Sequence, residues 1–303
     1  MVVDGSPEEV RQAHRAGLAS PVRVIEPDMS LGLNGKAAAV LSAVPFLRND
    51  SVVIADDDVR YSLDCLEQVA QRLRAADIVR PQNYFAPLVW HARWDTARSL
   101  LNRSLASDYP GTLGIRRARL EQGYGGDVLF ENLELIRTVL ARGGEEDRAD
   151  DIFVERRPPT ARAFWAQRVR QAYDSFAQPG RLVAELAIVP AVLLMCRRPV
   201  ALGVAGVAAI AVAERGRRRN GGGAVFAPTA ALWAPVWLAE RGLCSWAAVV
   251  MRLRGGPAYH GQRLKKAANS RRALHAAVIK EEQIERTVSD NNAVPERAAA
   301  GAR

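Results

Sequence analysis

Three consecutive aspartates follow a short apolar run in the segment SVVIADDDVR, residues 51–60. Because side chains alternate along an extended chain, Asp56 and Asp58 are expected on one side and Asp57 on the other. Two carboxylates at a strand end are hard oxygen ligands that suit Mg²⁺ or Mn²⁺. A cation held there can bridge nucleotide phosphates and neutralise the charge of a departing diphosphate. Taken alone, the triplet is equally well interpreted as a solvated acidic turn.

Two further segments place polar side chains where a nucleotide could bind. Asp4 ends the apolar pair in VVDGS, so its carboxylate lies at a strand end and can accept hydrogen bonds from a base or ribose. The run Asn34-Gly35-Lys36 precedes a helical stretch, whose first N–H groups and the Lys36 ammonium can meet phosphate oxygens. Each segment taken singly is more simply interpreted as a turn.

The segment EQGYGGDVLFENLELIRTV, residues 121–139, contains carboxylates that could serve as a general base. Glu131 and Glu134 are one helical turn apart and can share a face with Asp127. A carboxylate at a helix start in a cleft can take the proton of an acceptor hydroxyl. The alternative interpretation is a solvated amphipathic helix.

The stretch FWAQRVRQAYDSF, residues 164–176, puts Gln167 and Arg170 three residues apart on one helical face. An amide beside a guanidinium is a donor set for a diphosphate or a sugar hydroxyl. The alternative is an ordinary basic amphipathic helix.

The elements that must position these side chains alternate between strands and helices. Strands are expected over residues 22–25, 51–56 and 76–82, and helices over residues 36–44 and 63–76, the latter capped by Ser62. This alternation predicts an α/β domain with a mainly parallel sheet, helices on both faces and ligands at the carboxyl ends of the strands.

The second half of the chain is apolar and basic. Residues 1–180 contain 23 Lys and Arg against 25 Asp and Glu, whereas residues 181–303 contain 19 against 8. Basic residues that flank apolar segments indicate a membrane surface, and the aromatic–basic interleaving typical of RNA binding is absent, so no nucleic-acid partner is predicted.

Three apolar segments make up this half: residues 182–196, 199–213 and 226–253. The first two are each shorter than the roughly 20 residues that span a bilayer. They can form a tight hairpin, one long tilted helix or interfacial helices. Buried helices of an all-α soluble domain are the alternative, and the tail after about residue 276 is predicted to be disordered.

Cysteine and histidine usage predicts neither a zinc site nor a disulfide framework. The cysteines, Cys65, Cys196 and Cys244, are odd in number and far apart, and the four histidines form no ligand cluster. Reduced thiols are therefore expected.

The order of the segments VVDGS, NGKAAAVLSAV, VVIADDDV, GYGGDVLFENLEL and QRVRQ resembles a family 2 glycosyltransferase of the GT-A fold over roughly residues 1–180. The segment GGPAYHGQRLKKAANS, residues 255–270, is similar to the membrane portion of lipid-directed members such as ceramide and hopanoid-associated glycosyltransferases. The resemblance implies a Rossmann-like GT-A domain over 1–180, membrane-associated helices over 181–255, and a basic segment with a disordered tail over 256–303.

On the donor side, the resemblance implies a role for four residues. Asp4 would contact the nucleoside and Lys36 would lie near the nucleotide. Asp56 and Asp58 would bind the diphosphate through a divalent cation, Mg²⁺ or Mn²⁺.

On the acceptor side, the resemblance makes Gln167 and Arg170 ligands of the diphosphate or the acceptor. Glu131 is the expected base, with Asp127 as the fallback, because Asn132 replaces the family's usual aspartate and an amide cannot accept the proton. Gln171 stands where the family has Trp.

The family's first strand, with its Pro-x-x-x-Glu segment, is not found before VVDGS. The sheet is therefore expected to have an exposed edge beside the nucleotide. A chain of this kind is expected to be weakly active or part of a longer product.

The predicted activity is metal-assisted transfer of a sugar, with inversion, from a nucleotide-diphospho-sugar to a lipid or glycan hydroxyl. The expected location is the cell membrane, with the catalytic domain on the cytoplasmic side. A catalytically silent, membrane-associated protein that binds a nucleotide sugar or serves as a scaffold is the alternative. No motif identifies the sugar, the nucleotide or the acceptor.

Overall fold

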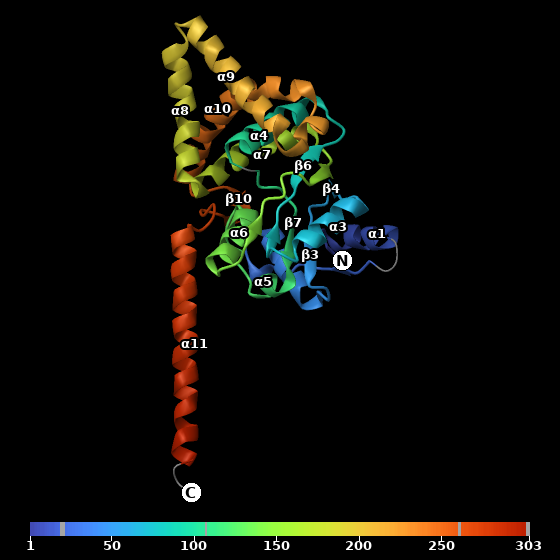
Figure 1. Ribbon diagram of the computed structural model, residues 1–303, viewed down its shortest axis with the longest axis vertical. Coiled ribbons are helices and arrows are strands. Elements are labelled where there is room, and N and C mark those ends of the chain that lie inside the picture. The colour runs from blue at the N-terminus through green and yellow to red at the C-terminus, as the bar shows by residue number, and fades with distance from the viewer. Residues whose placement is uncertain (19–21, 107, 260–261, 301–303) are drawn as a thin grey trace.

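The computed structural model describes residues 1–18, 22–106, 108–259 and 262–300. A mixed α/β body holds the first strands and helices α2, α3, α5 and α6 (Figure 1). Helices α8, α9 and α10 gather at one end of this body, and helix α11 projects from the other.

The first strands form a separate pair. Strand β1 (Val2–Val3) pairs in parallel with β2 (Val24–Ile25), and helix α1 (Glu8–Gly17) connects them. Strand β2 lies within the range expected from the sequence.

Two further sheets form the centre of the body. One has the order β3 (Ser51–Ile54), β7 (Leu113–Arg116), β5 (Ile78–Val79) and β8 (Glu146–Asp147), and the other has β4 (Val59–Arg60), β9 (Phe153–Arg156) and β6 (Gln82–Phe85). Strand β7 runs antiparallel to both β3 and β5, and β4 runs antiparallel to β9. Within these two sheets, the pairs β5–β8 and β6–β9 are parallel. The prediction of a mainly parallel sheet is therefore wrong, and the sheets are mixed.

The strand expected over residues 76–82 is divided between the two sheets. Strand β5 ends at Val79 and β6 begins at Gln82. Pro81 lies between them and has no N–H group for a strand ladder, which explains the break.

Local caps fix the helices of the body. Helix α2 (Gly35–Ala43) follows Asn34, whose side chain accepts hydrogen bonds from the N–H groups of Lys36 and Ala37. Helix α3 (Leu63–Arg72) follows Ser62, whose hydroxyl accepts from the Cys65 N–H, as predicted. Helices α5 (Arg117–Glu121) and α6 (Glu131–Ala141) complete this part, with apolar side chains of α6 packed on β5 and β7.

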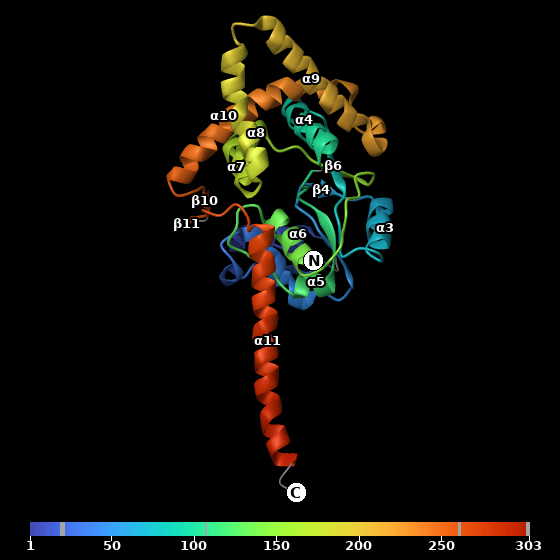
Figure 2. The same cartoon turned by 60° about the vertical axis from the view of Figure 1, so that its left-hand side comes forward.

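A layer of long helices covers the other end of the body. It contains α4 (Trp90–Leu105), α7 (Ala161–Tyr173), α8 (Pro179–Met195), α9 (Pro199–Arg218) and α10 (Ala234–Leu253). The short helices η3 (Asp174–Ala177), η4 (Arg219–Ala224) and η5 (Pro228–Trp233) connect them. Helices α4 and α7 of the first half pack with α9 and α10 of the second (Figure 2).

The first two apolar segments form a hairpin. Helix α8 ends at Met195 and α9 begins at Pro199, so Arg197 and Arg198 lie in the turn. Among the described residues, the helical run Pro199–Ala224 is the one long and apolar enough to cross a membrane.

The C-terminal part begins with the short strands β10 (Ala258–Tyr259) and β11 (Gln262–Arg263). His260 and Gly261 of the expected basic segment lie outside the described residues. Helix α11 (Arg271–Ala300) includes most of the tail for which the sequence predicts disorder. Arg142, which follows α6, forms an ion pair with Glu281 at 3.3 Å.

Gly216 allows helix α9 to approach helix α4 closely, because a Cβ atom at this position would lie 1.9 Å from the Leu100 carbonyl oxygen. We expect Gly216→Ala to lower the free energy of unfolding by about 1–3 kcal/mol, as overpacking does. Gly203→Ala, on the same helix with nothing within 4 Å of its Cβ position, is expected to stabilise by about 0.5–1 kcal/mol. Chemical denaturation measures both; equal effects would contradict the close packing of α9 on α4.

Candidate functional site

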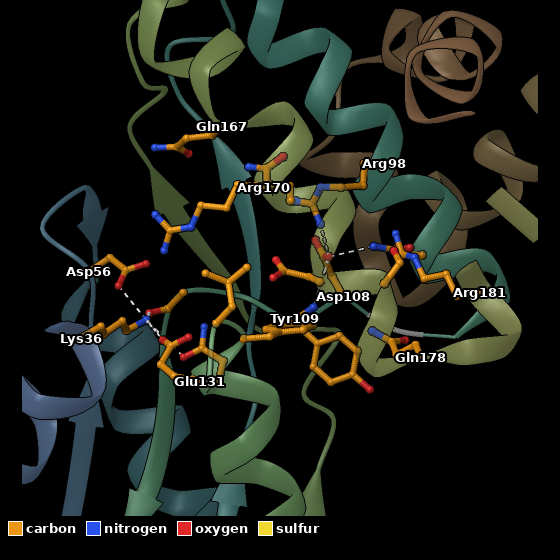
Figure 3. A pocket seen from close by; sticks show the side chains of 18 of the residues that line it. Lys36, Asp56, Arg98, Asp108, Tyr109, Glu131, Gln167, Arg170, Gln178 and Arg181 are labelled. Atoms are coloured by element: carbon orange, nitrogen blue, oxygen red, sulfur yellow. Dashed lines mark hydrogen bonds and ion pairs between the residues drawn. The ribbon is translucent and has the colours of Figure 1, made fainter. Parts of the chain in front are cut away.

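A pocket of about 300 Å³ lies between the α/β body and the long helices (Figure 3). Its charged lining residues are Lys36, Arg98, Arg156, Arg170, Arg181 and Arg241, with Asp56, Asp108, Glu131 and Asp174. Cations outnumber acids in this lining, so an anionic ligand suits it. The pocket lies beyond the carboxyl end of β3, where the sequence predicted a ligand.

At one end of the pocket, the Lys36 ammonium forms ion pairs with two carboxylates. Its Nζ atom is 2.7 Å from Asp56 Oδ1 and 2.9 Å from Glu131 Oε1, and it donates to the Gly111 carbonyl and the Asn132 amide oxygen. Figure 3 shows the two carboxylates on either side of this ammonium. Burial lowers the pKa of Lys36, but the charges of Glu131 and Asp56 outweigh burial and raise this pKa above its usual value.

Asp58 has a different cationic partner. Its Oδ2 atom lies 2.8 Å from Arg156 Nε, whereas its Oδ1 atom is buried and has no hydrogen-bond partner in the described part of the chain. Burial raises the pKa of Asp58; the Arg156 charge opposes this shift, while the charges of Asp56 and Asp57 add to it.

This carboxylate pair fits a divalent cation that binds together with a nucleotide. Within the described ranges there is no group of three or more His, Cys, Asp or Glu side chains that could hold a metal. Mg²⁺ commonly binds through one or two carboxylates and takes its other ligands from water and substrate phosphates. The unpartnered Oδ1 of Asp58 and the carboxylate of Asp56 would hold such an ion.

Of the two predicted bases, the structure places Glu131 in the pocket. Glu131 begins helix α6, where the helix dipole stabilises a negative charge. Asp127 is exposed, accepts a hydrogen bond from the Leu33 N–H at 2.9 Å, and does not line the pocket. Asn132 donates its amide to the Pro110 carbonyl at 2.8 Å while accepting from Lys36.

Helix α7 brings Gln167 and Arg170 to the pocket, as their spacing predicted. Figure 3 shows the guanidinium of Arg170 extending toward Asp56. The helix is fixed from behind by Arg168, which is 2% exposed and pairs with Asp95 at 2.9 Å and Glu240 at 2.5 Å.

Asp4 lies apart from these residues. Its carboxylate accepts from the Ser6 N–H and is 2.7 Å from His14 Nδ1, so it faces helix α1. These hydrogen bonds, that of His14 first, lower the pKa of Asp4 to about 2. Asp4 does not line the pocket, although the adjacent Val3 and Gly5 border a neighbouring cavity of about 1200 Å³ between β1 and β3.

Sequence reasoning missed Asp174, Arg181 and Arg241. Asp174 follows helix α7 without a distinguishing motif, and burial raises its pKa to about 7. Arg241 had a usable signal, because Glu240-Arg241 interrupts the apolar segment 226–253, and charges inside such segments commonly mark functional sites.

The fold and the site define a mixed α/β protein with a cation-lined pocket at a strand end. No protein family and no curated protein matches the sequence. Among solved structures, the chain is similar to a mannosyltransferase from Pyrobaculum calidifontis in complex with GDP-Man and Mn²⁺, with TM-score 0.48 and 18% identity over 83% of this chain and 75% of that one. It is also similar to a mycobacterial protein, with TM-score 0.30 and 15% identity over 53% of this chain and 57% of that one. Both scores lie below 0.5, and neither likeness establishes a family or an activity.

The buried carboxyl of Asp174 predicts a pH dependence of stability. Its pKa rises from 3.8 in the unfolded chain to about 7 in the folded protein, so folding is favoured while the group is protonated. Raising the pH from about 4 to above 7 is expected to remove roughly 3–5 kcal/mol of stability, and Asp174→Asn is expected to remove that loss. Chemical denaturation across this pH range measures the free energy of unfolding, with the exposed Asp50→Asn as control. If the free energy of unfolding of Asp174→Asn fell with pH as steeply as that of the wild type, the raised pKa of Asp174 would be contradicted.

Proposed function

We propose that the chain is a glycosyltransferase that moves a sugar from a nucleotide-diphospho-sugar to the hydroxyl of a lipid or glycan acceptor. The observation that carries this proposal is the Lys36 ammonium, which holds Glu131 and Asp56 within hydrogen-bonding distance of one atom. A base and a diphosphate-binding carboxylate thus share one pocket. The order of the five motifs along the chain supports the same function.

In the proposed reaction, Glu131 accepts the proton of the acceptor hydroxyl. The hydroxyl oxygen forms a bond to the anomeric carbon while the bond from that carbon to the diphosphate oxygen breaks. The nucleoside diphosphate leaves with the electron pair. Attack from the face opposite the leaving group inverts the configuration at the anomeric carbon.

The remaining residues bind and orient, and of these Asp58 borders the neighbouring cavity and not the pocket itself. Asp56 and Asp58 would hold Mg²⁺ or Mn²⁺, and that cation, when bound, supplies positive charge to the leaving diphosphate. Arg156 orients Asp58 through their 2.8 Å ion pair. Arg170 and Gln167 provide donors for phosphate or sugar oxygens.

A catalytically silent scaffold protein is the second candidate function, since Asn132 stands where family 2 glycosyltransferases usually have an aspartate. The contacts of Asn132 favour catalysis instead. Its amide bonds to Pro110 and Lys36, so it supports the ammonium that holds Glu131, and Glu131 remains as the carboxylate in the pocket.

Two substitutions separate donor binding from chemistry. Glu131→Gln is expected to lower sugar transfer by about 100-fold or more while leaving metal-dependent binding of the nucleotide sugar within about twofold. Asp58→Asn is expected to weaken that binding. Calorimetry with and without Mn²⁺, together with a transfer assay, measures both effects, and the exposed Asp57→Asn is the control.

The outcomes discriminate between the two candidates. Nucleotide-sugar binding without transfer in the wild-type chain would support the scaffold. Unchanged metal-dependent binding in Asp58→Asn would refute the metal assignment, and unchanged transfer in Glu131→Gln would refute the proposed base.

We also propose that the helical hairpin contacts a membrane, with the α/β body on the cytoplasmic side of the cell membrane. Large apolar side chains at its tip are highly exposed: Leu193 66%, Leu194 80%, Val200 80% and Val204 64%. Arg197 and Arg198 lie in the turn between them, where they can meet anionic lipid headgroups. An apolar patch rimmed by cations suits such a surface.

Substitutions at the hairpin tip test membrane contact. Leu194→Glu combined with Val200→Glu is expected to reduce cosedimentation with anionic lipid vesicles by about tenfold or more, because two charges would enter the apolar contact. Leu63→Glu, at a 73% exposed leucine of α3, is the matched control and is expected to bind normally. Equal vesicle binding by all three proteins would contradict the proposal.

A further inference from the structure

Arg241 of helix α10 is a buried cation that the proposed reaction does not use. Its side chain is 1% exposed and lines the pocket. Its Nε and Nη1 atoms have no hydrogen-bond partner within residues 1–18, 22–106, 108–259 and 262–300. A buried guanidinium with two unpartnered nitrogen atoms carries a large desolvation cost. An anionic ligand in the pocket would offset that cost.

Three acids interact electrostatically with Arg241, namely Glu185, Glu240 and Asp174, and the first two accept hydrogen bonds from other groups. Glu240 accepts from Arg168 at 2.5 Å, and Glu185 accepts from Arg181 Nε and from the Ser245 hydroxyl, both at 2.9 Å. The nearest aromatic ring is that of Trp237, whose centroid lies 5.1 Å from the guanidinium carbon of Arg241. The protein thus places Arg241 against the pocket without giving it a carboxylate partner within 4 Å among the described residues.

Arg181 supplies a second cation in the same region. Arg181 lies in the first turn of α8, and its side chain is 27% exposed. This side chain also lines the pocket. Figure 3 shows Arg181 and Gln178 at the end of the pocket opposite Lys36 and Asp56. The two ends are therefore separate, and Arg170 and Arg98 lie between them.

The helices that carry these two arginines present apolar side chains to the outside. On α8, Val183 is 68% exposed; on α10, Leu243 is 65% and Leu253 83% exposed. A ligand with a charged head in the pocket and a hydrocarbon chain along these faces would satisfy both surfaces.

We propose that Arg241 and Arg181 bind the phosphate of an acceptor lipid whose headgroup also carries the hydroxyl that attacks the sugar. This inference rests on the proposed glycosyl transfer and adds the class of acceptor. With the phosphate at the Arg241 end, the headgroup hydroxyl extends through the pocket toward Glu131, which lines the same space. Asp174 also lines the pocket along this path.

Calorimetry on the full chain in neutral detergent tests the site with octyl phosphate as the probe. We expect wild-type protein to bind octyl phosphate at least about tenfold more tightly than inorganic phosphate, and octyl glucoside not at all. Arg241→Gln and Arg181→Gln are each expected to weaken octyl phosphate binding about tenfold or more, and Arg241→Lys less. Arg215→Gln, an exposed arginine on α9, is the matched control.

Each remaining outcome has a defined meaning. Equal binding of octyl phosphate and inorganic phosphate would overturn the lipid source. Unchanged octyl phosphate binding in Arg181→Gln, which is partly exposed and expected to fold, would overturn the site even if Arg241→Gln is unstable. Nucleotide-sugar binding weakened as much as octyl phosphate binding would assign the arginines to the donor and overturn the acceptor role.

An assay of the reaction separates this inference from the proposed function. Lysophosphatidylglycerol and monoacylglycerol share hydroxyls and an acyl chain, but only the first has a phosphate. Transfer to lysophosphatidylglycerol at a rate at least about tenfold higher would support the inference. Equal transfer to both would overturn it while leaving glycosyl transfer intact. Octyl phosphate binding at Arg241 in a protein that binds no nucleotide sugar would overturn the acceptor role and the proposed function together.

Discussion

The arrangement of the site depends on one partly buried ion cluster, the Lys36 ammonium between Asp56 and Glu131. Two carboxylates this close together repel each other in a partly dry pocket unless a cation lies between them. The ammonium comes from the first turn of α2, Asp56 from the end of β3 and Glu131 from the start of α6. The cluster therefore fixes three elements of the body relative to one another, and the rest of the pocket is built around that fixed point.

A second ion network fixes the opposite wall. Arg168, buried in α7, joins Asp95 of α4 to Glu240 of α10. Removing Arg168 would leave the buried Glu240 carboxylate without its ion-pair partner, so these three helices are bound to a single packing arrangement. Arg103 adds a further link, because its guanidinium donates to the carbonyls of Asp150 and Gly216. The helical layer is thus an integral wall of the site.

The features that could be predicted from the sequence are those set by residues close together in the chain. The features that were missed depend on contacts between residues far apart in the chain. The Ser62 cap, the start of α2 after Asn34 and the shared face of Gln167 and Arg170 all follow from spacings of two to four residues. The antiparallel insertion of β7 between β3 and β5 depends on pairing across the whole domain, which local alternation cannot reveal. The same limit hid Arg241, which has no carboxylate partner within 4 Å in the described part of the chain, a property of the packed structure.

Asn132 shows how the fold constrains the chemistry. An aspartate there would place a third carboxylate around the single Lys36 ammonium, and the extra negative charge would have no cation of its own. It also could not donate to the Pro110 carbonyl when ionised, whereas the amide donates at 2.8 Å and still accepts from Lys36. The amide therefore satisfies both neighbours without adding charge. In the glycosyl transfer proposed above, the proton would therefore go to another group in the pocket, and Glu131 is one of the two carboxylates that the same ammonium holds there.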